Sequence, residues 1–104
     1  MINWIKKFLI DNTFGARRSP EWEKVRREHL KDEPECQVCG KIGRIISNEV
    51  HHIKPFYLYP AFELNPHNLI TLCRTHHFEW GHFFDWSSWN EDIGVWTEKI
   101  KNKP

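Results

Sequence analysis

Two pairs of metal-binding residue types constrain the fold more than any other feature of this sequence. Cys36 and Cys39 are separated by two residues on a predicted tight turn, and Cys73 and His76 repeat that spacing after a predicted strand. Each pair presents two corners of a tetrahedron from one local turn, as structural zinc sites of the Cys3His type require. One zinc ion bound by all four residues would clamp the two halves of the chain together.

A redox role for the same cysteines is the alternative. Cys36 and Cys39 would then form a dithiol pair, and Cys73 would be an ordinary buried cysteine of a strand. No thioredoxin-like βαβ pattern surrounds the pair, which favours the zinc interpretation. Three cysteines and an N-terminus unlike a signal peptide fit a reducing cytoplasm, that of a bacterium or of a phage-infected host.

The composition also favours a metal. A chain of 104 residues is long enough for one domain, and only 39% of it is apolar, so the core must be thin. Seven histidines exceed what packing needs. The net charge of +1 means that any binding of nucleic acid must come from a local basic patch.

Hydrophobic periodicity and turn signals predict an α+β domain over residues 1–104. Its three parts are an N-terminal helix with a basic linker (1–18), a core (19–82) and a tail (83–104) that carries Trp86, Trp89 and Trp96. Within the core we expect a helix over 19–33, strands over 44–53 and 68–73, and a short helix over 74–82. No segment is long and apolar enough to predict a membrane span.

A second group of polar residues carries the candidate chemistry. His51 and His52 stand at the end of the first predicted strand, where alternation sends their side chains to opposite faces. One imidazole can then bind a metal while its neighbour accepts a proton from water. Asn68 precedes the second strand, and His77 follows the second zinc pair directly.

These segments together resemble the zinc-containing HNH endonucleases, which are common in bacteriophages and mobile elements. The resemblance rests on Cys36-Gln-Val-Cys-Gly, Glu49-Val-His-His-Ile-Lys-Pro and Asn68-Leu-Ile-Thr-Leu-Cys-Arg-Thr-His-His, and it extends over about 20–82. It implies a small ββα-metal core with a zinc knuckle and flanking helices. It also implies hydrolysis of DNA phosphodiesters to 5′ phosphate and 3′ hydroxyl ends, with one divalent ion (Mg²⁺, Mn²⁺, Ni²⁺ or Zn²⁺) besides the structural zinc.

The resemblance further implies a role for each residue of the second group. His51 and His77 would hold the catalytic ion, and His52 would be the general base. Asn68 would pin the loop that orients His52.

Members of the family that this sequence resembles and that have three histidine ligands usually carry the third four residues after the second, but that position here is Gly81. His82 lies one residue later and could bind the ion only if the helix ends or distorts near Gly81. Otherwise His82 would pack against the tail or contact a phosphate.

DNA is the expected partner, gripped through its backbone by basic side chains. The candidates are Arg17, Arg18, Lys24, Arg26, Arg27, Lys54 and Arg74. No base-reading module is evident, so we expect low sequence specificity, and one active site predicts nicking by a monomer or paired cuts by a homodimer.

Two other functions stay open at this stage. The chain could be a non-catalytic zinc-stapled module that binds DNA or protein. It could also be an accessory to a phage packaging terminase, a partner that the resemblance suggests. In that case the tryptophans of the tail would form a docking surface, and otherwise they would fold back over the thin core.

Overall fold

The computed structural model describes residues 18–43 and 46–102, and it has the predicted α+β architecture. The predicted N-terminal helix and Arg17 of the basic linker lie outside these residues. The elements are α2 (Trp22–Asp32), β1 (Glu49–His52), the 3-10 turns η1 (Pro60–Phe62) and η2 (Pro66–Asn68), β2 (Leu69–Leu72), α3 (Arg74–His76), the π-helical turn η3 (His77–Gly81) and α4 (Ile93–Lys101).

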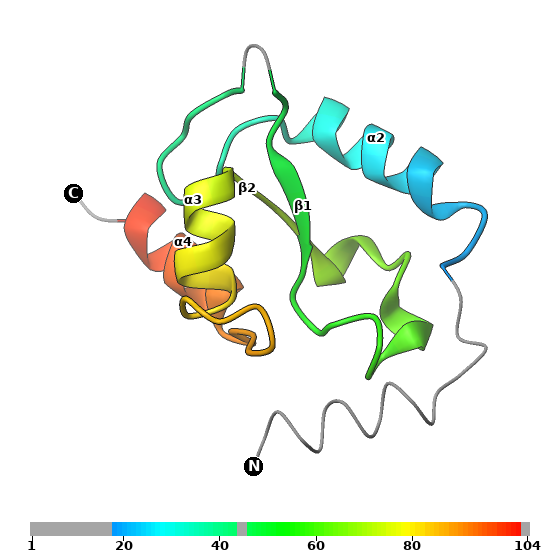
Figure 1. The fold of residues 1–104 in the computed structure, drawn as a ribbon. Coiled ribbons are helices and arrows are strands. Elements are labelled where there is room, and N and C mark those ends of the chain that lie inside the picture. The colour runs from blue at the N-terminus through cyan, green and yellow to red at the C-terminus, as the bar shows by residue number, and fades with distance from the viewer. Residues whose placement is uncertain (1–17, 44–45, 103–104) are drawn as a thin grey trace.

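A short antiparallel hairpin of β1 and β2 forms the centre of the fold. His51 lies opposite Ile70 and His52 opposite Leu69. Figure 1 shows α2 on one side of this hairpin, with α3, η3 and α4 on the other. All four residues of β2 are buried between these layers, and the core cluster consists of Cys36, Ile70, Leu72 and Ile93. The core is therefore small.

The helix after the basic linker begins slightly later than the predicted residue 19. Glu21 occupies the N-cap position of α2, while the Ser19 side chain accepts a hydrogen bond from the backbone N–H of Glu21 at 3.1 Å. Ser19 thus closes the turn that leads into the helix. The half-buried side chains of Trp22, Val25 and Leu30 recur at helical spacing, as the sequence predicts.

Residues 44–45 of the predicted strand 44–53 lie outside the described residues, and within 46–53 the strand β1 covers only Glu49–His52, opposite the four residues of β2. The buried Asn48 lies just before β1, and its side-chain amide donates hydrogen bonds to the backbone carbonyls of Pro34 (2.8 Å) and Lys41 (2.7 Å). These bonds join the cysteine turn to the start of β1.

The tail contains a helix, α4, that the sequence analysis did not predict. Ile93 and Thr97 of α4 are buried. The spacing of Ile93, Trp96 and Ile100 is helical and could have indicated it. Within residues 18–43 and 46–102, no helix is both long and apolar enough to cross a membrane.

Candidate metal centres

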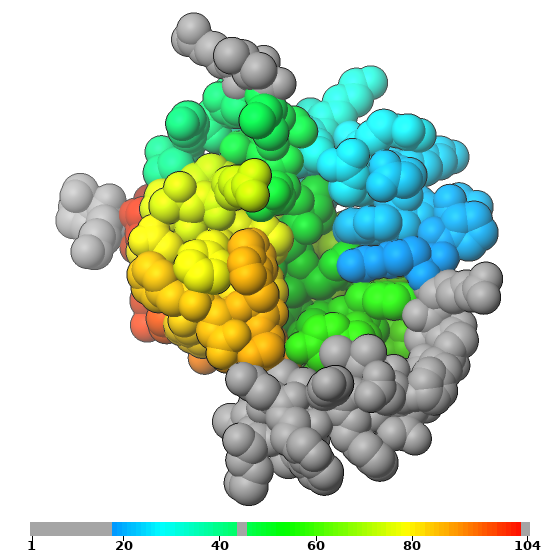
Figure 2. Space-filling model, viewed as in Figure 1, coloured from blue at the N-terminus to red at the C-terminus, as the bar shows by residue number. Residues whose placement is uncertain are grey.

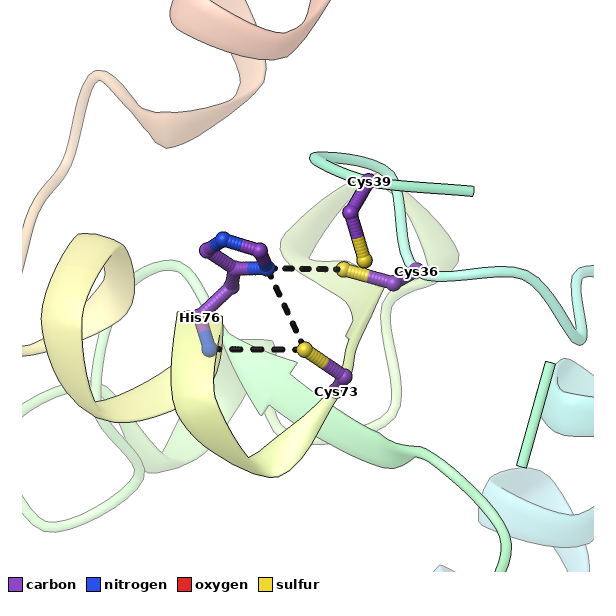
Figure 3. Close-up of side chains that lie close together, drawn as sticks. All are labelled: Cys36, Cys39, Cys73 and His76. Atoms are coloured by element: carbon purple, nitrogen blue, oxygen red, sulfur yellow. Dashed lines mark hydrogen bonds between the residues drawn. The ribbon is translucent and has the colours of Figure 1, made fainter. Parts of the chain in front are cut away.

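The four residues of the predicted zinc site lie together, and we call them the Cys3His cluster. The ligand atoms of Cys36, Cys39, Cys73 and His76 all lie within 4.8 Å of one another. Figure 3 shows His76 Nδ1 facing two thiols, 3.2 Å from Cys73 Sγ and 3.7 Å from Cys36 Sγ. Zinc bonds of about 2.0 to 2.3 Å from one ion can reach four atoms so spaced. The donor set therefore fits a tetrahedral ion.

The electrostatics of the thiols also fit a cation. Burial raises the pKa of Cys36, but N–H groups of Cys73, Cys39 and Val38, with His76, outweigh it and lower the pKa from 9.0 to about 7. The pKa of Cys73 is raised by burial and by its two thiol neighbours. Crowded thiolates repel one another, and a divalent ion among them removes that penalty.

A second set of ligand atoms belongs to His51, His77 and His82, which we call the three-histidine cluster. One ligand atom from each lies within 4.8 Å of the others. His51 is 1% exposed, and its Nε2 has no hydrogen-bond partner among the described residues. Burial, followed by the neighbouring histidines, lowers its pKa well below 6.5. A buried, neutral, unpartnered imidazole is well suited to bind a metal.

The π-helical turn explains how His82 joins this cluster despite its spacing. Residues His77–Gly81 form η3, in which hydrogen bonds run from i to i+5 instead of i to i+4. His82 follows this turn, and its Nε2 lies 3.2 Å from His77 Nε2. The distortion near Gly81 that the sequence analysis required is therefore present.

Two hydrogen bonds hold the cluster's rings in the orientation that a metal ligand needs. His77 Nδ1 lies 2.9 Å from Glu49 Oε1, and His82 Nδ1 lies 2.6 Å from the Ser88 carbonyl oxygen. An acceptor at each Nδ1 keeps the proton there and leaves the Nε2 lone pair free. The sequence analysis assigned no role to Glu49 or Ser88.

His52 lies on the opposite side of β1, against α2. Its ring stacks on Trp22 with centroids 4.4 Å apart, and its Nε2 lies 2.9 Å from the Glu63 carbonyl oxygen. That carbonyl can only accept, so Nε2 carries the proton and Nδ1 is the basic atom. Burial lowers the pKa of His52 below 6.5, although the Glu63 carbonyl opposes the shift.

Asn68 joins the end of the hairpin to the loop that carries Glu63. Its Oδ1 accepts from the Lys54 N–H at 2.8 Å, and its Nδ2 donates to the carbonyls of Lys54 (3.1 Å) and Phe62 (3.2 Å). The side chain is thus fully engaged at both ends. Because Phe62 directly precedes Glu63, these bonds fix the carbonyl that His52 contacts.

Glu63 is a further residue that the sequence analysis missed. Its side chain is 4% exposed and accepts the Ser19 N–H at 3.0 Å, and it pairs with Arg18 at 3.5 Å. The Arg18 guanidinium also lies over Phe56, 4.6 Å from the ring centroid. Glu63 therefore ties the entry of α2 to the loop that orients His52.

A pocket of about 250 Å³ is lined both by His52 and by the three-histidine cluster, and we call it the histidine pocket. Its lining includes Arg18, His51, His52, His77, His82 and Trp86. In Figure 2 the surface is hollowed along β1, between the start of α2 and the segment that follows α3. The candidate base and the three-histidine cluster thus face one cavity, with a cationic side chain at its wall.

The predicted basic residues fall into separate places. Lys24 and Arg27 are exposed on α2, and Arg26 pairs with Glu23 at 3.5 Å. Arg74 is exposed on α3, and Lys54 Nζ lies 4.8 Å from the Tyr59 ring centroid. Among the described members of the set, only Arg18 lines the histidine pocket.

Comparison with known proteins gives one finding. Residues 36–78 match the family model described as HNH endonuclease. The matched segment contains the Cys3His cluster, both candidate histidines of β1, Asn68 and His77. No curated protein and no solved structure matches the chain.

Proposed function

We propose that this protein is a metal-dependent nuclease that hydrolyses DNA phosphodiester bonds at the histidine pocket, and the match of residues 36–78 to the HNH endonuclease family model supports the proposal. The observation that carries the proposal is the placement of a neutral, carbonyl-oriented histidine beside three convergent imidazoles. Phosphodiester hydrolysis needs a base for water and positive charge for the phosphate. His52 would be that base, and a divalent ion held by the three imidazoles would supply the charge in the same pocket.

His52 is the proposed general base. Its Nε2 proton is held by the Glu63 carbonyl, so Nδ1 takes the proton from an attacking water. The new bond forms between the water oxygen and phosphorus, and the bond from phosphorus to the 3′ oxygen breaks. The leaving oxygen takes a proton from solvent, which gives a 5′ phosphate and a 3′ hydroxyl.

His51, His77 and His82 are the proposed ligands of the catalytic divalent ion. When bound, such an ion supplies positive charge to the scissile phosphate and its leaving oxygen. Glu49 and Ser88 orient two of the three rings, and the third is buried without another partner. Imidazole ligands favour Mn²⁺, Ni²⁺ or Zn²⁺ over Mg²⁺.

The Cys3His cluster is proposed to hold a structural zinc. It joins the cysteine turn to α3, and η3 follows α3 directly, so the ion would fix the element that presents His77. Arg18 is proposed to contact the phosphate, and the basic residues of α2 the flanking backbone. With one such pocket per chain, we expect nicking with low sequence specificity.

Single-turnover cleavage of a labelled duplex tests the proposal. The zinc-loaded protein is assayed with each divalent ion added in turn, beside His52→Ala and the matched control His67→Ala, whose side chain is exposed on η2. Loss of a general base predicts a rate about 10² to 10⁴ lower for His52→Ala and no change for His67→Ala. Equal rates for all three proteins would remove His52 from the mechanism. If the folded wild-type protein cleaves DNA with none of the ions, the nuclease proposal is refuted and the alternative function, a non-catalytic zinc-stapled binding module, is favoured.

A further inference from the structure

A second concave site lies beside the histidine pocket, and we call it the aromatic cleft. It has a volume of about 580 Å³ and is lined by Arg74, Thr75, Phe78, Glu79, Phe84 and Trp86. Phe78 forms its centre, with ring centroids 5.0 Å from Trp86 and 5.8 Å from Phe84. The sequence analysis named two of its lining residues, Arg74 as a contact to the DNA backbone and Trp86 as part of the tail, but it predicted no cleft here.

The aromatic walls of this cleft are unusually exposed. Phe84 is 65% exposed and Trp86 is 55% exposed. Phe84 and its neighbour Phe83 both have left-handed backbone angles, with φ of 64° and 51°. Bulky residues rarely adopt that conformation, and two in succession cost folding free energy. The turn therefore leaves most of the Phe84 ring exposed to solvent.

Trp86 is shared by the aromatic cleft and the histidine pocket. It lines both cavities, and its ring lies 4.9 Å from that of His82 and 5.3 Å from that of His77. A strand whose phosphate occupies the histidine pocket therefore has the aromatic cleft within reach of a neighbouring nucleotide.

We propose that the aromatic cleft binds an unstacked nucleobase of the strand being cut, an inference that rests on the proposed nuclease function. Flat aromatic walls stack on the face of any base. Arg74 supplies donors for a base edge, Glu79 supplies acceptors, and Thr75 supplies both. The Glu79 carboxylate would repel a second phosphate, so a neutral base fits this cleft better than backbone does.

This site would select unpaired DNA. A base inside a duplex is covered by its neighbours and must leave the stack to reach an aromatic wall, which costs free energy. A bulged or frayed base avoids that cost. The enzyme is thus expected to bind and cut next to unpaired nucleotides in preference to continuous duplex.

Binding of two fluorescent oligonucleotides tests the proposal without relying on cleavage. Each carries 2-aminopurine, whose emission falls on stacking, in a single-base bulge or in a fully paired duplex. The zinc-loaded protein is titrated with no further metal. Variants are Phe84→Ala, Phe84→Tyr and the matched control Phe83→Ala, whose ring packs on Trp96 outside the cleft at 5.9 Å. Thermal melts of each variant check the fold.

We expect quenching of the bulged probe and tighter binding of it than of the paired probe. Phe84→Ala should weaken bulge binding roughly 5- to 150-fold, the range for losing one base-stacking ring. Phe84→Tyr keeps an aromatic ring and should retain wild-type affinity for the bulged probe, and Phe83→Ala should leave that affinity unchanged. Equal affinity for both probes without quenching would overturn the inference. Self-association lost in Phe84→Ala, again without quenching, would assign the cleft to a second copy of this chain.

The same samples separate this inference from the nuclease proposal. Wild-type cleavage of a duplex with added metal, but no preference for the bulge, refutes the base site and keeps the nuclease. Quenching of the bulge with no cleavage by any metal keeps the base site and refutes the nuclease.

Discussion

Replacing Gly81 by alanine should weaken the proposed catalytic metal site while leaving the Cys3His cluster intact. A Cβ at this position would lie 3.1 Å from His51 Cε1, 3.2 Å from His51 Nδ1 and 3.3 Å from His77 Cδ2. Ordinary contacts begin at 3.4 Å, so the closest ring atom must move by 3.4 − 3.1 = 0.3 Å. Both rings belong to the three-histidine cluster.

The size of the effect follows from the tolerance of metal coordination. Ligand distances in real sites stay within about 0.2 Å of their usual values, and the required movement exceeds that. His51 is buried and His77 is held by Glu49, so neither ring can retreat freely. We therefore expect affinity for the second metal to fall about tenfold, the low end of the range for disturbed ligand orientation.

Gly94→Ala is the matched control, because a Cβ at Gly94 meets nothing within 4 Å. Both glycines lie in helical segments with φ outside the left-handed range. Gly94→Ala should stabilise α4 by about 0.5 to 1 kcal/mol and raise Tm by about 2 to 8 °C. The assay is calorimetric titration of Mn²⁺ into zinc-loaded protein, with thermal melts. Unchanged Mn²⁺ affinity in Gly81→Ala, with Tm raised as in Gly94→Ala, would refute the reasoning.

Four other predictions follow from the two clusters and their supports. Cys73→Ser should lose the bound zinc and the cooperative melt, since a structural zinc of this kind contributes about 10 kcal/mol or more to folding; a wild-type Tm without zinc by elemental analysis would contradict this. Glu49→Ala removes the acceptor for His77 Nδ1, so it should retain zinc but bind the second metal about 10- to 100-fold more weakly in the same titration, and equal affinity would show that Glu49 does not orient His77. Asn68→Asp keeps the acceptor for the Lys54 N–H but replaces the donating amide group, which faces two carbonyls, by an oxygen. The free energy of unfolding, measured with denaturant, should therefore fall by about 2 kcal/mol or more, and an unchanged unfolding midpoint would count against this reasoning. His52 must be neutral to accept a proton and its pKa is lowered, so kcat/KM should hold at pH 6.5 and fall only as the pH drops further; a fall centred above pH 6.5 would be the opposite result.

The local parts of both candidate metal centres were predictable from sequence, because spacing within one turn fixes geometry. Two residues separate Cys36 from Cys39, and two separate Cys73 from His76, so each pair forms within one turn. The opposite facing of His51 and His52 follows from strand alternation, and the structure shows one against η3 and the other against Trp22. The α+β class follows from the same periodicities.

Parts that depend on long-range contact were not predictable in the same way. Glu63 approaches Ser19 and His52 only after the loop between the strands folds back. His82 enters its cluster through a π-helical turn, and π geometry has no simple residue signature. The left-handed turn at Phe83 and Phe84 contradicts the intrinsic preference of both residues, so periodicity could not indicate the cleft.

Metal content and cleavage measured on one preparation test the central claim most directly, namely that one tightly held ion shapes the fold and a second enables chemistry. Protein carrying one zinc per chain is titrated with Mn²⁺, and native mass spectrometry counts bound ions while nicking of supercoiled plasmid is followed. We predict that neither protein nicks the plasmid with one ion per chain. As the second ion binds, nicking should increase for the wild type but not for His52→Ala. Full nicking with one ion per chain, or equal nicking by His52→Ala, would contradict the account.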